Sequence, residues 1–356
     1  MIRRFFAYPE SGWALAALGG LFATAAAALS ALGNPSATGL CASCFLVNVA
    51  GALGLHAKAS QSYLRPELLG IILGSFFAAF AAREFRVRGG ASPVFHFCGG
   101  VFLLLGCEVF IGCPIKALLR TAGGGAVGLV GLAGLAAGVL FAIPFLRDGF
   151  ALRAKRALPE PAGLVLPAAA FLLLLATSAG AGIFAPVFPG GEARHAPFAV
   201  SAAAGLIFGA AGQRSRFCVT GSIRNAALAR DFREGAGTVA FLAVATLINV
   251  LSGVFNPTLS LEPGAHTDLL WAFLAMGMVG FGAILVAGCP FRQVVLASTG
   301  DLDAVAAVAG MLAAAGVSVT FGIGSSPEGV TAAGKLAVLG GWIFFIASGL
   351  AKRRAA

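Results

Sequence analysis

The chain has 356 residues, of which 59% are hydrophobic and only 11% are charged, and its mean hydropathy is +0.93. A soluble globular domain carries about 25% charged residues, so this composition excludes an ordinary soluble enzyme and a disordered protein. The net charge is +10, but the basic residues lie in short connections between apolar segments. The positive-inside rule explains them without a nucleic-acid partner. The sequence therefore predicts an all-α polytopic membrane protein.

The first apolar segment, Trp13–Leu32, follows the basic sequence Met1–Phe5 and is long enough to cross a bilayer. We expect it to be an uncleaved membrane helix, since it is longer than the apolar part of a signal peptide. Segments shorter than about 17 residues are candidates for re-entrant or broken helices. The later apolar segments are Cys41–His56, Leu68–Ala82, Pro93–Gly112, Ala126–Leu146, Leu164–Phe184, Phe198–Gly212, Ala236–Phe255, Leu269–Gly288, Ala304–Ile323 and Lys335–Leu350.

The connections between these segments differ in charge. Arg83–Arg88, Arg147–Arg156 and Lys352–Arg354 are basic, and the positive-inside rule predicts that they face the cytoplasm. Ala185–Pro197 and Asn256–Asp268 are poor in Lys and Arg and are predicted to face outward. This charge bias fits a multi-pass membrane protein.

A short motif occurs once in each half of the chain. Gly112-Cys113-Pro114-Ile115-Lys116 recurs 176 positions later as Gly288-Cys289-Pro290-Phe291-Arg292, and Gly124 and Gly300 keep the same spacing. Internal duplication is typical of transporters whose site lies at the interface of two repeats. We therefore predict two internally repeated halves with re-entrant or broken helices, in which residues 1–146 form the first membrane repeat, 147–163 a basic cytoplasmic linker and 164–356 the second membrane repeat.

The repeated motif predicts a helix start that attracts an anion. Pro114 and Pro290 are suited to the first helical position, where the missing N–H costs nothing. The preceding Cys113 or Cys289 then faces the free backbone N–H groups and the positive end of the helix dipole. Lys116 and Arg292 each add a cation, and Gly112 and Gly288 complete the two helix-start motifs. The structural alternative is a helix break in which the cysteine is only a small apolar residue.

Three further sites are candidates for chemistry. Cys218 and Arg224 lie in the polar stretch 213–225, where an arginine fork could bind an oxyanion or serve only as a basic loop residue. Cys41 and Cys44 form a C-x-x-C motif, and without a second such pair or nearby histidines it predicts neither a zinc site nor another metal or cofactor. The motif predicts either two thiols that line the path of a substrate or a reversible dithiol, and the structural alternative is a pair of small buried residues in a broken helix. Glu108 is a carboxylate in an apolar segment, which indicates a functional group or one that reaches the interface.

Taken together, these residues resemble the YeeE/YedE family of bacterial inner-membrane sulfur transporters, and within it the branch associated with selenium metabolism. The resemblance implies an hourglass of two pseudo-symmetric halves that takes up ions of the thiosulfate type. It also implies a relay of S–H···S contacts along Cys113, Cys218 and Cys289. It rests on the two Gly-Cys-Pro motifs and on the segments Gly39–Phe45, Ala50–His56, Tyr63–Glu67 and Glu84–Gly90.

The leading hypothesis is therefore a permease or channel, not an enzyme, for a small sulfur- or selenium-containing ion that passes membrane-embedded cysteines. The substrate is either an anion or a neutral acid such as hydrogen selenide. The chain has no P-loop motif, so energy comes from a gradient, a partner or metabolic trapping. The expected partners are the ion, membrane lipid and a cytoplasmic sulfur or selenium carrier protein, with no nucleic acid. The alternatives are a membrane thiol oxidoreductase or sulfur/selenium-transferring enzyme, and an assembly partner of a selenoenzyme.

Overall fold

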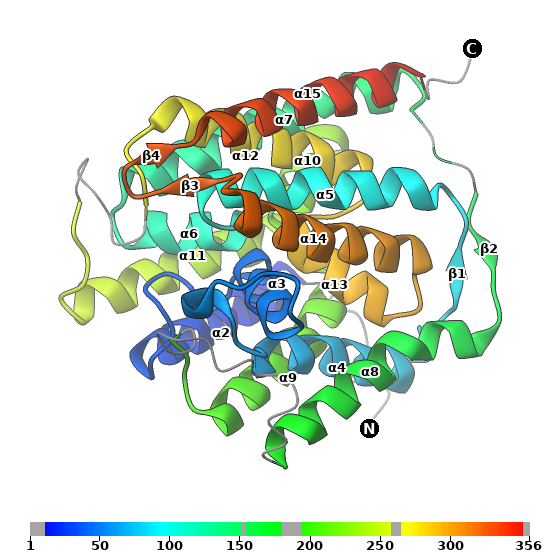
Figure 1. Ribbon diagram of the computed structural model, residues 1–356, viewed down its shortest axis with the longest axis horizontal. Coiled ribbons are helices and arrows are strands. Elements are labelled where there is room, and N and C mark those ends of the chain that lie inside the picture. The colour runs from blue at the N-terminus through cyan, green and yellow to red at the C-terminus, as the bar shows by residue number, and fades with distance from the viewer. Residues whose placement is uncertain (1–10, 151, 153, 180–193, 258–264, 352–356) are drawn as a thin grey trace.

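The computed structural model describes residues 11–150, 152, 154–179, 194–257 and 265–351. The predictions for Met1–Phe5, for Lys352–Arg354 and for most of Ala185–Pro197 and Asn256–Asp268 lie outside the described residues, as does the end of the predicted segment Leu164–Phe184. The described residues are mostly α-helical (Figure 1), which confirms the predicted helical class.

Most of the chain is in long apolar helices. Nine stretches of the described residues are long and apolar enough to cross a membrane, which fits a multi-pass membrane protein. Large apolar side chains such as Leu172, Val239 and Ile343 are about two-thirds exposed on their outer faces, as expected where lipid is the solvent. The long helices are α2 (Gly12–Ala31), α4 (Pro66–Ala81), α5 (Pro93–Phe110), α7 (Ala126–Arg147), α8 (Glu160–Ser178), α9 (Phe198–Ser215), α11 (Arg233–Leu251), α12 (Leu269–Leu285), α14 (Leu302–Phe321) and α15 (Ala332–Ala351).

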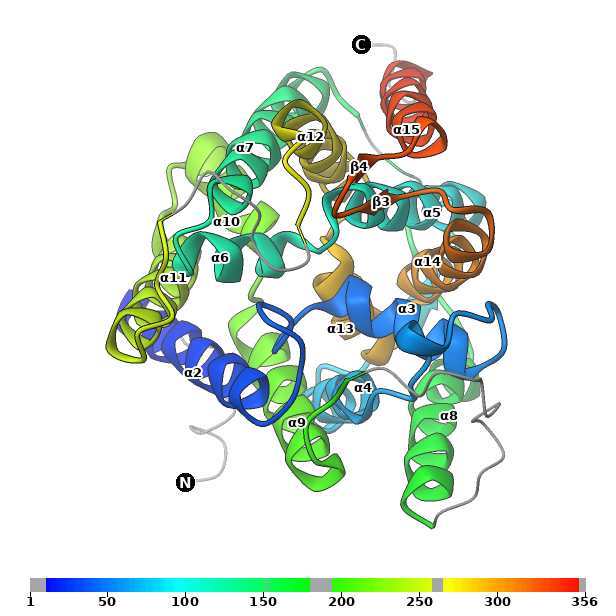
Figure 2. The same cartoon turned by 60° about the vertical axis from the view of Figure 1, so that its left-hand side comes forward.

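Four short helices lie among the long ones, and in Figure 2 they occupy the middle of the molecule. They are α3 (Ala42–Ala52), α6 (Pro114–Ala122), α10 (Val219–Ala229) and α13 (Pro290–Ser298), and a single 3-10 turn, η1 (Ala59–Gln61), follows α3. The Gly-Cys-Pro motifs correctly predicted the starts of α6 and α13. The sequence analysis did not predict α10, because its polar composition was interpreted as a loop.

The described residues also contain two small antiparallel ribbons that were not predicted from the sequence, one between distant loops and one a local hairpin. β1 (Arg88–Gly89) pairs with β2 (Arg156–Ala157), and β3 (Ser325–Ser326) pairs with β4 (Gly329–Val330). The first ribbon brings two of the basic connections to one end of the molecule (Figure 1). There the Arg88 guanidinium and the Lys155 ammonium both contact the buried Asp301 carboxylate.

Glycines allow the long helices to pack backbone against backbone. A Cβ at Gly134 or Gly138 of α7 would overlap a carbonyl oxygen of α12, and a Cβ at Gly310 of α14 would overlap the carbonyl oxygen of Phe97 in α5. α4 packs on α9, and α2 packs on α11, in the same close manner. Small residues at helix contacts are the usual basis of helix association in membranes, because burying apolar surface there gives no net free energy for association.

The helices α6 and α13 run in opposite directions from the interior to the two ends of the molecule. At the end of α13, Thr299 accepts a hydrogen bond from the Arg86 N–H, beside β1. At the end of α6, Gly123 accepts one from the Asn256 N–H. α7 follows α6 directly and runs 22 residues back to the linker that contains β2, so the end of α6 lies opposite the β1–β2 end.

Replacing Gly138 by valine should separate α7 from α12, because the added side chain would overlap the carbonyl oxygen of Gly277. Overpacking costs about 1–3 kcal/mol, and a helix backbone is less able than a side chain to move aside. We expect a lower thermal unfolding temperature in detergent and a lower yield of monodisperse protein. Gly235→Val is the control, since a Cβ at position 235 meets nothing within 4 Å. Equal losses in both variants would contradict this account of the packing.

Candidate functional site

The first thiol cluster lies where α3 and α6 begin. Cys41 is the N-cap of α3, and its thiol donates a hydrogen bond to Cys44 Sγ over 2.7 Å. Cys41 Sγ also accepts the Cys44 N–H at 3.4 Å and lies 3.4 Å from the Ser43 hydroxyl. Cys113, the N-cap of α6, has its side chain next to Cys41. The structure therefore brings together three of the five predicted site cysteines, and all of these thiols are free.

Lys116 places a positive charge against this cluster. Its side chain is 7% exposed, and its Nζ lies 3.8 Å from Cys44 Sγ. Among the described residues it forms no ion pair with a carboxylate. Glu108, the predicted carboxylate of this region, is half-buried in α5 near Lys116 and Cys41 but outside ion-pair distance. An ammonium group held in this way attracts an anion, because a buried charge without a partner is costly.

The second thiol cluster lies where α10 and α13 begin. Cys218 is the N-cap of α10 and Cys289 the N-cap of α13, and their side chains are neighbours. The Cys218 Sγ lies 3.2 Å from the Thr220 hydroxyl. Both thiols are buried. Position 221, three residues after Cys218, is a glycine, so this cluster has no equivalent of the C-x-x-C partner Cys44.

Arg292 has the same relation to the second cluster that Lys116 has to the first. It lies in the first turn of α13, near Cys218 and Cys289, and its Nη1 donates a 3.4 Å hydrogen bond to the Gly212 carbonyl. Within the described part of the chain, Arg292 makes no ion pair, although Glu234 lies in its vicinity. Each thiol cluster is therefore accompanied by one cation that no carboxylate neutralises.

The helix starts have a strained backbone immediately before the cysteines. Ile111 (φ 59°) and Ala287 (φ 69°) are left-handed although neither is glycine, and such residues usually occur where the surrounding structure requires the conformation. The next residue, Gly112, has a φ of 159°, and a Cβ there would lie 2.5 Å from Lys116 Cδ. The sharp turn thus ends α5, starts α6 and fixes the lysine stem beside the turn.

The two thiol clusters belong to adjoining parts of the interior. α3 contacts α13, and α6 contacts α10. The predicted relay of Cys113, Cys218 and Cys289 is therefore distributed over two clusters, with Cys113 beside Cys41 and Cys218 beside Cys289. The remaining two thiols are not N-caps: Cys107 is buried within α5 beside the first cluster, and Cys98 is half-buried in the second turn of α5.

A buried polar network that the sequence analysis missed holds the far end of α3. Arg65 is 1% exposed, and it donates hydrogen bonds from Nε to Asn48 Oδ1 at 2.6 Å and from Nη1 to Asn34 Oδ1 at 3.0 Å. Glu67, which is fully buried, accepts from Asn34 Nδ2 at 2.9 Å and from the Ser201 hydroxyl at 3.0 Å. The network therefore ties α3, α4 and α9 together around one buried charge pair.

A similar but more open group of residues lies along α10. The predicted residue Arg224 donates from Nε to Asn225 Oδ1 at 3.0 Å, and Asn225 in turn donates to Glu234 Oε2 at 2.9 Å. Asn48 and Asn225 both lie seven residues after a helix-starting cysteine, and this shared spacing is the signal that would have found them. Nearly all of α3 is buried, whereas most residues of α10 remain partly exposed.

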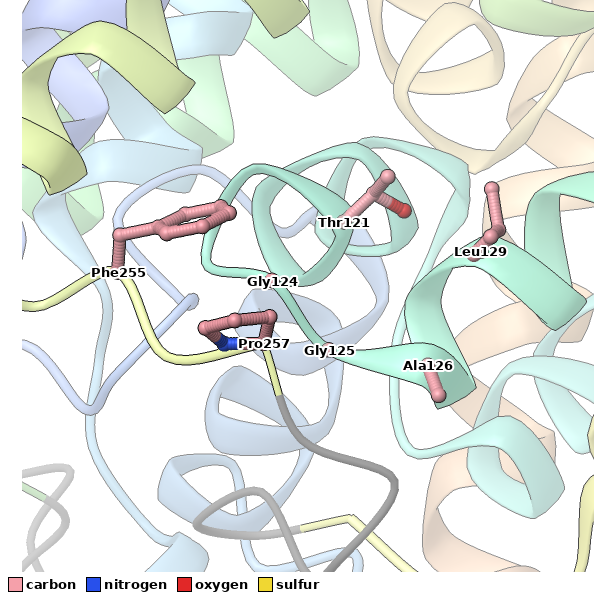
Figure 3. A pocket seen from close by; sticks show the side chains of 7 residues that line it. All are labelled: Thr121, Gly124, Gly125, Ala126, Leu129, Phe255 and Pro257. Carbon is pink, nitrogen blue, oxygen red and sulfur yellow. The ribbon is translucent and has the colours of Figure 1, made fainter.

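A hollow of about 400 Å³ lies away from both clusters, at the far end of α6 (Figure 3). It is lined by Thr121, Gly124, Gly125, Ala126, Leu129, Phe255 and Pro257, and so has no thiol or charged side chain. We therefore assign the candidate site to the thiol clusters and not to this hollow.

Comparison of the chain with protein-family models and with curated proteins gives no match. The function is therefore inferred from the geometry of the two clusters and from the sequence motifs that carry the resemblance.

Replacing Arg65 by methionine should strongly destabilise the protein, because it leaves the Glu67 carboxylate buried without its cation. Removing one partner of a buried charge pair costs about 3–5 kcal/mol. The double variant Arg65→Met/Glu67→Gln should recover part of this loss in thermal unfolding measurements. Arg233→Met breaks the exposed contact with Asp231 and should leave the unfolding temperature unchanged. If Arg65→Met also left it unchanged, the network would not hold α3 in place.

Proposed function

We propose that this protein is an inner-membrane permease or channel for a small sulfur- or selenium-containing inorganic anion. The observation that carries the proposal is a pair of cations, the buried Lys116 and the half-buried Arg292, each beside helix-starting thiols and without a carboxylate partner in the described part of the chain. A soft sulfur- or selenium-containing anion matches this surrounding, because the cation attracts its charge and the polarisable thiols contact its soft atom.

The proposed architecture is a pair of repeats related by a pseudo-twofold axis in the membrane plane. Several matching features at the 176-residue spacing support it. Gly124 and Gly300 have φ values of 92° and 91°, and the close approach of Gly134 to the Phe273 carbonyl corresponds to that of Gly310 to the Phe97 carbonyl. The helices of the two halves also pair in the same pattern. α2 packs on α11 as α9 packs on α4, and α5 packs on α14 as α12 packs on α7.

This scheme changes one detail of the sequence-based prediction, the boundary between the repeats. The helix starts align Cys41 with Cys218, since both are N-caps of 11-residue helices. The helix α8 then closes the first half in the way that α15 closes the second, so the boundary between repeats moves from position 164 to the connection between Ser178 and Phe198. The two terminal helices break the symmetry, because α8 packs on α4 and α15 packs on α5 and α12.

In the proposed path, the ion meets the beginnings of four short helices. α6 and α13 run from the interior to opposite ends of the molecule and start at cysteines, and α3 and α10 start at cysteines beside them. Free N–H groups and the dipoles at helix N-termini favour an anion. The ion would pass from the Cys41, Cys44 and Cys113 cluster to the Cys218 and Cys289 cluster, or in the reverse direction.

The resemblance to the YeeE/YedE family supports this function and the bacterial inner membrane as its location. The basic connections gathered at the β1–β2 end fit a cytoplasmic face under the positive-inside rule. We propose that a cytoplasmic sulfur or selenium carrier protein receives the ion there. We propose no catalytic role for the path in this function, and energy would come from a gradient or from consumption of the ion inside the cell.

The alternative function is a membrane thiol oxidoreductase or a sulfur- or selenium-transferring enzyme. The 2.7 Å contact between Cys41 and Cys44 favours it, because adjacent thiols can react in sequence. Such an enzyme would carry a persulfide or selenide on a cysteine during turnover. Mass spectrometry of protein purified after exposure to substrate would detect this adduct, whereas a permease would release the ion unchanged.

Replacing Lys116 or Arg292 by glutamine should weaken uptake of a charged substrate. A charge-assisted contact is worth about 1.5–3 kcal/mol, or roughly ten- to a hundredfold in binding. We expect the half-saturating concentration of thiosulfate or selenite in proteoliposomes to rise by about this factor. Lys335→Gln is the control, because the side chain of this lysine is 40% exposed and already has a carboxylate partner, Asp268. An unchanged half-saturating concentration in both the Lys116 and the Arg292 variant would remove these residues from the path.

Replacing Cys113 or Cys289 by serine should cut the uptake rate while the protein still inserts and folds. A hydroxyl keeps the hydrogen bond but is less polarisable than a thiol, so the soft contact with the ion is lost. The initial rate of labelled uptake into proteoliposomes measures the effect, with Cys98→Ser as the control outside both clusters. Normal rates in the Cys113 and Cys289 variants would exclude a thiol-lined path.

A further inference from the structure

The first thiol cluster contains one reactive group more than the second. Three residues after its N-cap cysteine, α3 carries Cys44, whereas α10 carries Gly221 at the same place after Cys218. Anion conduction by two similar halves does not require this extra thiol, because the second cluster lacks it. The difference therefore indicates a property of the first cluster alone.

The geometry of Cys41 and Cys44 is that of a dithiol ready to close. Their Sγ atoms are 2.7 Å apart, and a short further approach gives an S–S bond, whose length is about 2.05 Å. Both residues lie in the first turn of α3, and the Cys44 N–H already donates to Cys41 Sγ. A C-x-x-C motif at a helix N-terminus is a common arrangement of exchange-active cysteines, since the helix end stabilises a thiolate.

Access singles out Cys44 as the attacking thiol. Cys44 is half-buried, while Cys41 and Cys113 are fully buried. The Lys116 Nζ lies 3.8 Å from Cys44 Sγ and has no carboxylate partner among the described residues. A neighbouring ammonium stabilises the thiolate, which is the nucleophile in thiol–disulfide exchange. Cys41 is in contact with Cys44 and serves as the resolving thiol.

We infer that Cys41 and Cys44 are a redox-active dithiol, which a small external disulfide oxidises to an intramolecular disulfide. The Cys44 thiolate attacks one sulfur of the oxidant, the oxidant's S–S bond breaks, and one thiol leaves. The Cys41 thiol then attacks Cys44 Sγ, and the second thiol leaves. In total two S–H bonds are lost, one S–S bond forms, and the oxidant is reduced to two thiols that carry off both protons and both electrons.

Oxidation should also stop conduction, and this part rests on the proposed function. The disulfide removes two thiol donors from the first cluster and leaves Lys116 beside a group that can no longer become a thiolate. The protein would then take up the ion only when the dithiol is reduced, so the first cluster would make uptake depend on the thiol–disulfide balance on its side of the membrane.

The test of the dithiol is thiol counting in purified full-length protein. The protein is equilibrated with mixtures of reduced and oxidised glutathione, free thiols are blocked with maleimide, and the peptide containing residues 41–44 is measured by mass spectrometry. We expect this peptide to lose two hydrogens and both maleimide labels as the oxidised fraction rises, and dithiothreitol to restore them. A peptide that keeps both thiols at every ratio, in protein that dithiothreitol leaves folded, would overturn the inference.

Two variants keep the test independent of folding. Cys44→Gly copies the second half and should show no disulfide at Cys41, with its unfolding temperature reporting whether it folds. Gly221→Cys builds the same motif at Cys218, where a Cβ would lie 3.6 Å from the Cys218 Sγ. It should gain a second glutathione-sensitive pair. Glutathione attached to Cys41 or Cys44 in wild-type protein at equilibrium, without the internal disulfide, would count against the proposal.

Uptake measurements separate this inference from the proposed function. Wild-type proteoliposomes should take up labelled thiosulfate or selenite when reduced and lose this uptake after oxidation. Oxidation should not change the uptake rate of Cys44→Gly, whatever that rate is. Uptake by the wild type that continues after complete disulfide formation would overturn the link to conduction. If reduced protein carries no ion although the disulfide forms, the proposed function and this link fail, while the redox-active dithiol stands.

Discussion

The interior of this protein depends on helices that begin at its centre. A helix start leaves backbone N–H groups without intrahelical partners, and in a membrane protein these groups cannot be left facing lipid. Here α3, α6, α10 and α13 start at buried cysteines, and only α3 has a side-chain cap, from Cys41. Long helices surround these starts (Figure 2), so their free N–H groups lie inside the protein and not on its outer face.

The charges of the interior follow from the same constraint. Arg65 and Glu67 neutralise one another within a network of amide and hydroxyl groups, and this network makes a rigid support for α3. Lys116 and Arg292 have no such counter-charge among the described residues, and both lie beside thiols. A paired buried charge serves structure, whereas an unpaired one attracts an ion. This contrast is the physical basis for the proposed anion path.

The outer shell of long helices makes the interior rigid in a different way. Glycines bring the α5–α14 and α7–α12 pairs into backbone contact, so that these helices cannot rotate without collision. The short helices then have fixed neighbours, and the two cation positions are set by the turns at Ile111 and Ala287. The support of α3 is tighter than that of α10, which leaves more of its surface exposed.

The sequence by itself determined the membrane class, most of the long helices and the two Gly-Cys-Pro helix starts, because composition, apolar length and the Pro position act locally along the chain. It also identified Cys113, Lys116, Cys289 and Arg292 as candidates. It missed α10, a polar helix that is stabilised by contacts with distant helices. It also missed the network of Arg65 with Asn34 and Asn48. Only the tertiary structure decided which thiols are neighbours and which cations lack a carboxylate. Both properties depend on side chains brought together across 70 residues or more, and no local pattern of residues encodes such distances.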